Sequence, residues 1–104
     1  MTRRVVYSPR ARQHVTHLYL WIAEQTGFPE RAEAYVSAIF DYVDELAQFP
    51  MIGLARDDVR PDLRTIGFRR RTVIAFAVGE GTVEIHGVYY GGQDYESLIV
   101  AEES

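Results

Sequence analysis

The sequence predicts an α+β fold in which an N-terminal hairpin of two helices packs on a small antiparallel sheet, within one domain spanning residues 1–104. Apolar residues recur at every third or fourth position over residues 8–27 and again over 29–49, which predicts two amphipathic helices. From residue 63 onward, alternating or dense apolar runs separated by glycines predict strands. The expected order is therefore β-α-α-β-β-β, followed by a short tail.

The first strand and the first helix meet at a typical helix start. Residues 5–7 are β-prone and end at Ser8, which is expected to cap the helix, while Pro9 suits its first turn. The apolar stripe of this helix is expected to consist of Ala11, Val15, Leu18 and Ile22.

The second helix follows almost at once. Gly27 separates it from the first helix, and Pro29 and Glu30 suit its beginning. Residues 50–53, which read Pro-Met-Ile-Gly, are expected to end it. Two helices joined this tightly form an antiparallel hairpin whose shared stripe must pack on the sheet. The second helix is expected to contribute Ala32, Tyr35, Val36, Ile39, Val43 and Leu46 to this apolar stripe.

Three strands are expected in the second half of the chain. Residues 51–62 are polar and rich in turn formers, so they predict a loop. Residues 63–68 alternate, and residues 71–78 are denser in apolar side chains, as in a central strand. The Gly-Glu-Gly sequence at 79–81 predicts a hairpin turn.

The last strand is expected over residues 82–90, with Val83, Ile85 and Tyr89 on one face. Two glycines at 91–92 end it. Asp94 is then placed to cap a short terminal helix that runs through Val100.

Composition and charge exclude several classes of protein. The chain has no cysteine, so it has neither a disulfide framework nor a thiolate site. The N-terminus shows no signal peptide and the chain no membrane span, so the expected location is the cytoplasm. All eleven basic residues are arginines and none follows Arg71, while the net charge is −4. A general attraction of the whole protein to nucleic acid is therefore not expected, while the net charge leaves a local basic patch open.

The spacing of several short motifs resembles the ParE toxins of the RelE/ParE superfamily, over about residues 5–98. Relatives carry Ala-x-x-Asp-Leu-x-x-Ile in the first helix, Ala-x-x-Tyr followed by Ile, Ile, Leu, Pro and Gly in the second, Arg-Pro-x-Leu-Arg before the sheet, and Gly-x-x-Asp-Tyr-Glu after the last strand. The matching residues here are Ala11, His14, Val15, Leu18, Trp21 and Ile22, then Ala32, Tyr35, Ile39, Val43, Leu46, Pro50 and Gly53, then Arg60, Pro61, Leu63 and Arg64, and finally Gly91, Asp94, Tyr95 and Glu96.

The chain also departs from the family pattern. His14 stands where relatives have Asp, and Phe76 where many have Tyr. The last strand of many relatives ends in His-Gly-Arg-Arg, whereas residues 90–93 read Tyr-Gly-Gly-Gln here. The late basic residues are therefore missing.

The resemblance implies the toxin of a type II toxin–antitoxin module, one that poisons DNA gyrase by binding and forms a hetero-oligomer with a ParD-like antitoxin. It implies no catalytic set, cofactor, metal, membrane contact or direct DNA binding. RelE-like relatives instead cut messenger RNA on the ribosome, which needs a base, a cation and an acid. The C-terminal segment offers only tyrosines and Gln93, and an ordinary tyrosine, with a pKa of about 10, is a poor base at neutral pH. The ribonuclease is therefore kept as the alternative function. A binding module without toxicity is the third hypothesis.

Nine residues are candidates for contacts with a partner: Trp21, Tyr35, Tyr42, Arg64, Arg69, Arg70, Arg71, Tyr90 and Tyr95. For the first three, a place in the core or at its edge is the preferred interpretation, because they fall at helical spacing, and a groove for an antitoxin segment is the alternative. Residues 69–71 equally suit a solvated strand end. His14 and His17 are one helical turn apart, but too few further ligands accompany them for a metal, so two surface histidines are expected.

Overall fold

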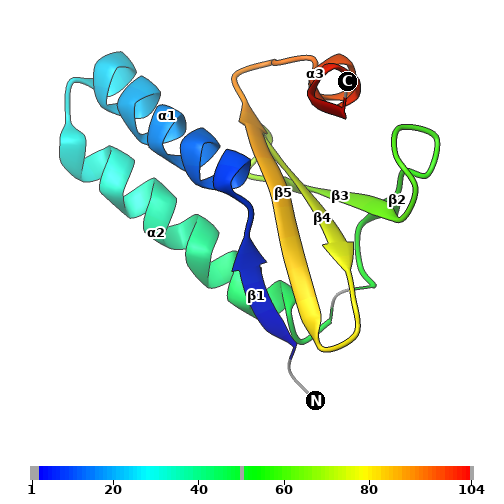
Figure 1. Ribbon diagram of the computed structural model, residues 1–104. Helices are drawn as coiled ribbons and strands as arrows, with labels where there is room; N and C mark the ends of the chain where they lie inside the picture. The colour runs from blue at the N-terminus through cyan, green and yellow to red at the C-terminus, as the bar shows by residue number, and fades with distance from the viewer. Residues whose placement is uncertain (1–2, 50, 104) are drawn as a thin grey trace.

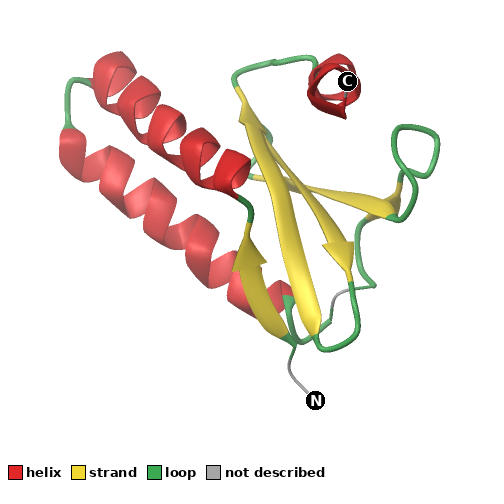
Figure 2. Ribbon diagram, viewed as in Figure 1, coloured by secondary structure: helices red, strands yellow, loops and turns green. Residues whose placement is uncertain are grey.

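The computed structural model describes residues 3–49 and 51–103, and it forms three layers (Figure 1). A pair of long helices covers one face of a five-stranded sheet, and a short C-terminal helix lies on the opposite face (Figure 2). None of the helices in the described segments is long and apolar enough to span a membrane. The elements are β1 (Arg4–Tyr7), α1 (Pro9–Thr26), α2 (Pro29–Leu46), β2 (Leu54–Ala55), β3 (Leu63–Phe68), β4 (Thr72–Val78), β5 (Thr82–Tyr90) and α3 (Tyr95–Glu103).

The helical hairpin forms as the sequence predicts. The Ser8 Oγ accepts a hydrogen bond from the Ala11 amide at 3.0 Å, which caps α1. Gly27 ends α1 at φ 73°, a left-handed conformation that glycine adopts without a steric cost. The second helix ends at Leu46, earlier than expected, and Pro50 lies outside the described residues.

The sheet is mixed, with the strand order β1-β5-β4-β3-β2. The α+β class and the hairpin are confirmed, and strands β2 to β5 are antiparallel as expected. The expectation of a wholly antiparallel sheet is wrong for β1, which pairs parallel with β5. This pairing joins opposite ends of the chain, so local spacing carries no signal for it. The two-residue strand β2 was expected to be loop.

A bulge in β5 reverses the orientation of its second half. Ala75 pairs with Gly87 while Phe76 pairs with Ile85, so His86 is an extra residue. Val83 and Ile85 therefore face the hairpin, whereas Tyr89 faces α3, and the expectation that these three share a face is wrong. Position 87 requires glycine because the Tyr89 ring lies against it. A Cβ at this position would lie 2.6 Å from the Tyr89 hydroxyl.

The main core lies between the hairpin and the sheet, and a smaller one lies under α3. Phe76 of the central strand β4 is fully buried against the expected stripes of both helices. On the other face, Ile99 of α3 is buried against Tyr89. The buried residues of the main core are Ala11, Leu18, Ile39, Val43, Leu46, Phe68, Ile74, Phe76, Val83, Ile85 and Val88.

His14 is not the surface histidine that the sequence predicts. Its Nδ1 accepts a hydrogen bond from the Val88 amide at 3.1 Å, and its Nε2 lies 3.6 Å from Glu102 of α3. Burial lowers the pKa of His14, although the Glu102 carboxylate opposes this effect. The neutral ring is therefore part of the contact between α1 and β5.

This lowered pKa predicts a loss of stability in mild acid. In the unfolded chain His14 takes up a proton near its ordinary pKa of about 6.5, whereas the folded protein resists protonation. The free energy of unfolding should therefore fall as the pH drops from about 7.5 to about 5.5, by at most about 1.4 kcal/mol per unit of pKa shift. Urea titrations should show that His14→Gln flattens this slope, while His17→Gln on the exposed side of α1 does not. An equal slope in both variants would contradict the assignment.

Candidate partner-binding site

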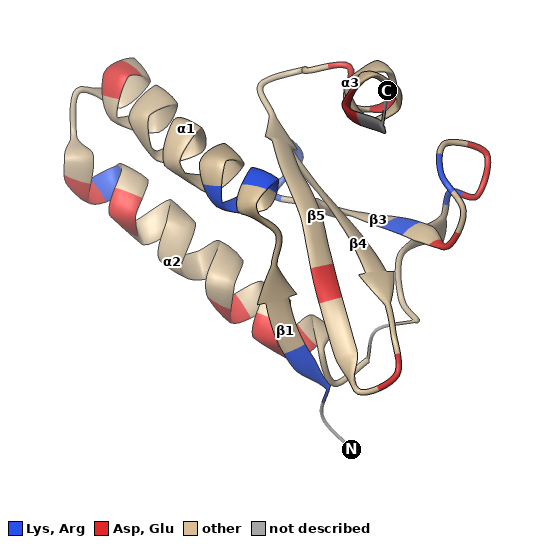
Figure 3. Ribbon diagram, in the orientation of Figure 1, with Lys and Arg blue, Asp and Glu red and all other residues tan. Residues whose placement is uncertain are grey.

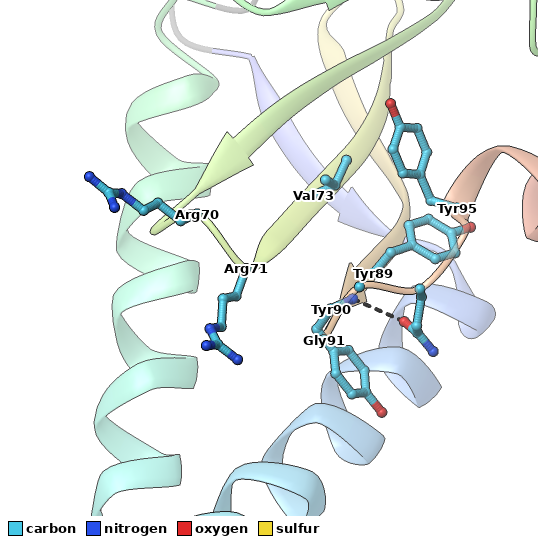
Figure 4. A pocket seen from close by; sticks show the side chains of 9 residues that line it. Arg70, Arg71, Val73, Tyr89, Tyr90, Gly91 and Tyr95 are labelled. Atoms are coloured by element: carbon cyan, nitrogen blue, oxygen red, sulfur yellow. Dashed lines mark hydrogen bonds between the residues drawn. The ribbon is translucent and has the colours of Figure 1, made fainter.

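An open cavity lies at the end of the sheet where the β3–β4 turn meets the exit from β5 (Figure 4). Its volume is about 430 Å³. Strands β3, β4 and β5 position it from one side, and the start of α3 closes the other side. The lining residues are Arg70, Arg71, Val73, Tyr89, Tyr90, Gly91, Gly92, Gln93 and Tyr95.

The β3–β4 turn holds two arginines in an unusual backbone conformation. Phe68 and Thr72 form the last pair of the two strands, so residues 69–71 make the connection. Arg69 and Arg70 have φ values of 48° and 65°, a region that costs roughly 1 kcal/mol or more for a residue with a side chain. Arg70 and Arg71 are exposed and leave the turn in different directions (Figure 4).

The exit from β5 is tied to this turn. The Gly91 amide donates a hydrogen bond to the Arg71 carbonyl at 3.1 Å, and Gln93 Oε1 accepts one from the Tyr90 amide at 2.9 Å. The Tyr90 ring packs on Trp21 of α1 with centroids 5.3 Å apart. Burial raises the pKa of the Tyr90 hydroxyl, so it keeps its proton at neutral pH and is a poor base.

Aromatic side chains of α2 support the turn from the helical side. The Tyr35 hydroxyl lies 2.7 Å from Thr72 Oγ1, and the rings of Tyr35 and Tyr42 both pack on Phe68. The Arg69 guanidinium lies over the Tyr35 ring at 5.6 Å and over the Phe68 ring at 5.1 Å. Tyr35 and Tyr42 are half-buried at the edge of the core. Tyr35 contacts Arg69 directly, whereas Tyr42 packs on Phe68 beneath it.

Seven of the nine candidates therefore gather at one end of the molecule. We call the centre of this region the arginine corner, defined as the exposed Arg69, Arg70 and Arg71 together with the half-buried Trp21 and Tyr90. Tyr35 and Tyr42 adjoin it from α2, and Tyr95 lines the far wall of the cavity.

Arg64 is not part of the arginine corner. It lies near the start of β3, at the end of the strand opposite the β3–β4 turn. There its NH2 group donates to the carbonyls of Met51 at 2.8 Å and Gly53 at 3.3 Å. Its guanidinium holds the segment before β2 by the backbone, which is a structural role.

Tyr95 belongs to a second cluster, centred on Arg56. The Arg56 guanidinium donates to the Tyr95 hydroxyl at 2.7 Å, to Glu96 at 2.9 Å and to both oxygens of Asp58 at 3.0 Å. The hydrogen bonds to the two carboxylates raise the pKa of Arg56. This cluster fastens the loop after β2 to α3, and sequence reasoning missed it because its members lie about 40 residues apart.

Sequence reasoning also missed a cluster of charged side chains around His86 in β5. His86, the bulged residue, has Nδ1 2.9 Å from Arg60 NH1 and Nε2 3.3 Å from Glu84 Oε1. Both ring nitrogens are therefore occupied, and the ring connects the loop before β3 to β5. No group of three or more metal-binding side chains assembles within residues 3–49 and 51–103.

The strained turn leads to a stability prediction. Arg70→Gly should raise the free energy of unfolding by about 0.5–1 kcal/mol, because glycine adopts a positive φ without the steric cost and only partly offsets this gain through chain entropy. Arg71→Gly is the matched control, since Arg71 is not among the residues with positive φ, and it should not stabilise the protein. Thermal unfolding of both variants measures the difference. A destabilising Arg70→Gly would show that the arginine itself stabilises the turn.

A helical hairpin on a mixed sheet, with an arginine-rich and aromatic surface at one end of the sheet, defines a small α+β protein whose architecture agrees with the family that the sequence motifs indicated. A family model described as "ParE toxin of type II toxin-antitoxin system, parDE" matches residues 5–95. The chain belongs to the ParE toxin family of type II toxin–antitoxin systems.

Individual relatives agree with this assignment. Toxin ParE1 from two strains of Mycobacterium tuberculosis is 28% identical over 96 residues, which cover 92% of this chain and 97% of the relative. A solved structure titled "Chromosomal ParDE TA system from P. aeruginosa" superposes with a TM-score of 0.73 at 22% identity, over 86% of this chain and 96% of that one. This likeness shows that the fold is shared.

Proposed function

We propose that this protein inhibits DNA gyrase by binding it and that a ParD-like antitoxin neutralises it in a cytoplasmic hetero-oligomer. The observation that carries the proposal is the arginine corner of a ParE-family chain. Arg, Tyr and Trp are the residue types that most often dominate the binding energy of protein interfaces. Here two arginines and three tyrosines line an open cavity, and Trp21 packs on Tyr90 beside it. The net charge of −4 supports a protein target rather than direct binding of DNA by the toxin alone.

The chemistry of the cavity supports binding without catalysis. Among the described residues that line it, the titratable groups are two arginines and three tyrosines. The arginines would stabilise a phosphate, but the raised pKa of Tyr90 disfavours proton removal from a ribose hydroxyl. A protein-binding surface needs no such proton transfer.

The His86 cluster is the observation that favours the alternative, a RelE-type endoribonuclease. A histidine between a carboxylate and an arginine has the composition of an acid–base site. However, its two nitrogens face Arg60 and Glu84, so neither accepts a substrate proton without a rearrangement. The proposed gyrase inhibitor therefore remains the better-supported function, and a non-toxic binding module is the remaining alternative.

A supercoiling assay with purified gyrase tests the proposal. We expect the purified protein to block DNA supercoiling by gyrase, and we expect addition of the antitoxin to restore it. The same preparation, added to translating ribosomes, should leave the messenger RNA intact. Transcripts cut on ribosomes, with cutting lost in His86→Ala or Arg71→Ala, would instead establish the ribonuclease. Inertness in both assays would favour the non-toxic module.

A further inference from the structure

Exposed apolar side chains concentrate at the sheet edge, far from the arginine corner. Phe49, Met51, Ile52 and Leu54 are 68%, 65%, 47% and 62% exposed and fall within six residues. We call these four residues the edge patch. Soluble monomers seldom expose so many large apolar groups together unless they form a binding surface.

The edge patch is held in its exposed position. The Arg64 guanidinium contacts the carbonyls of Met51, Ile52 and Gly53, so this segment is fixed by its backbone while its side chains stay outside the core. Gly53 has φ 88° and lies so close to β3 that a Cβ would come within 2.7 Å of the Thr65 carbonyl. The exposure is therefore built into the fold rather than a consequence of a loose loop.

The neighbouring strand β2 has an outer edge available for pairing. Arg56 donates its amide to the Leu63 carbonyl and Leu54 pairs with Thr65. Between these two positions, the amide and carbonyl of Ala55 point away from β3 in an antiparallel ladder. Edge strands are usually protected by charges, irregularities or short length. Strand β2 is short, but its two residues, Leu-Ala, carry no charge.

A cavity of about 200 Å³ adjoins this edge, and its charged lining residues are Asp57, Asp62 and Arg64. Met51, Ala55, Leu63 and Val78 form its apolar walls. Two carboxylates, Asp57 and Asp62, line it from the loop after β2, which carries both acidic and basic residues (Figure 3). The Arg64 guanidinium also lines the cavity, but its hydrogen bonds go to the backbone carbonyls of residues 51–53.

We infer that the edge patch and this cavity bind an extended segment of the antitoxin that combines apolar residues with a lysine or arginine. The segment pairs with Ala55, places an apolar side chain between Met51 and Leu63, and sets its cation against Asp57 and Asp62. Charge complementarity selects a basic segment here, whereas the arginine corner selects an acidic one. The identity of the partner as the antitoxin rests on the proposed function. The two surfaces lie at opposite ends of β3, so substitutions can separate them.

Antitoxin binding by toxin variants tests this inference. Met51→Glu combined with Leu54→Glu should weaken the complex at least about 100-fold, since it places two charges in an apolar contact. Asp57→Asn combined with Asp62→Asn should weaken it about tenfold and reduce its dependence on salt. The matched control is Leu20→Glu combined with Phe28→Glu, two apolar residues of the hairpin that are 57% and 53% exposed. It should leave affinity unchanged.

The readouts separate this inference from the proposed function. All three double variants should still inhibit gyrase if the corner is the target-binding surface. Unchanged antitoxin affinity in the Met51/Leu54 variant would overturn the inference. A Met51/Leu54 variant that binds the antitoxin normally but no longer inhibits gyrase would overturn it as well. A wild-type dimer in light scattering that Leu54→Glu dissociates would overturn it in favour of a second copy of this chain.

A second arm covers the case in which the antitoxin does not bind the wild type, which would contradict the proposed module. Fluorescent peptides of alternating lysine and valine, or of glutamate and valine, then probe the surface directly. Tighter binding of the lysine peptide, lost in the Met51/Leu54 variant, would support the surface as described. Equal binding of both peptides would overturn it.

Discussion

Alanine in place of Ile39 or Leu18 should lower the free energy of unfolding by roughly 2–5 kcal/mol, the usual range for emptying a buried aliphatic site. Ile39 is fully buried and Leu18 is 1% exposed, and both belong to the core between the hairpin and the sheet. Each substitution removes apolar contacts and leaves a cavity that close-packed neighbours fill only in part.

The effect is large relative to the stability of the whole molecule. Domains of this size are stabilised by about 5–15 kcal/mol, so either variant should lose a large fraction of the free energy of unfolding. Urea unfolding followed by circular dichroism measures the change. Leu20→Ala is the matched control, because this residue lies on the same helix but is 57% exposed, and it should change stability by less than about 0.5 kcal/mol. Small effects at both buried positions would mean that the helix faces are assigned wrongly.

Local patterns predicted the individual elements well. Residues 63–68 and 82–90 are strands as expected, because their alternation and the flanking glycines act over a few residues. The Ser8 cap and the Asp94 cap also form, since each requires only a side chain and an amide three residues later.

Long-range features could not be predicted from such patterns. The parallel pairing of β1 with β5 joins residues almost 80 positions apart. The bulge at His86 shifts the register of β5 by one residue, and one residue is enough to send Tyr89 to the opposite face. Nothing in the local sequence distinguishes Val88-Tyr89 with a bulge from the same residues without one.

The candidate site was predictable only in part, for a similar reason. Arg69, Arg70 and Arg71 are consecutive, so they had to lie together. Tyr90 was a candidate from the family pattern alone, and its place beside them comes from the pairing of β4 with β5. Residue type alone could not separate them from Arg64, which is bound by backbone carbonyls at the other end of β3. Arg56 and His86 were overlooked because their partners come from distant segments.

Charge reversal at the arginine corner should have the largest functional effect. Arg70→Glu combined with Arg71→Glu should raise the concentration needed for half inhibition of gyrase at least about 100-fold. Each truncated interface arginine commonly costs about 2 kcal/mol when it is a dominant contact, and about 1.4 kcal/mol corresponds to a tenfold change in affinity. If these arginines meet acidic side chains of the target, reversal also adds repulsion between like charges.

A control variant with the same change in net charge separates the effect of the arginine corner from that of the total charge of the protein. Arg4→Glu combined with Arg12→Glu gives the same net charge, and both arginines are exposed on β1 and α1, away from the β3–β4 turn. This control should inhibit gyrase like the wild type. Both double variants should keep the far-ultraviolet spectrum of the folded protein, because none of the four side chains is buried.

The outcome also tells the two surfaces apart. If the corner binds the target and the edge patch binds the antitoxin, the Arg70/Arg71 variant should keep most of its antitoxin affinity while it loses inhibition, the reverse of the Met51/Leu54 variant. Full inhibition by the Arg70/Arg71 variant would remove the corner from the mechanism. Equal loss of inhibition in the Arg4/Arg12 control would mean that the long-range field of the whole protein, rather than these two side chains, governs association with gyrase, and the effect should then disappear at high salt.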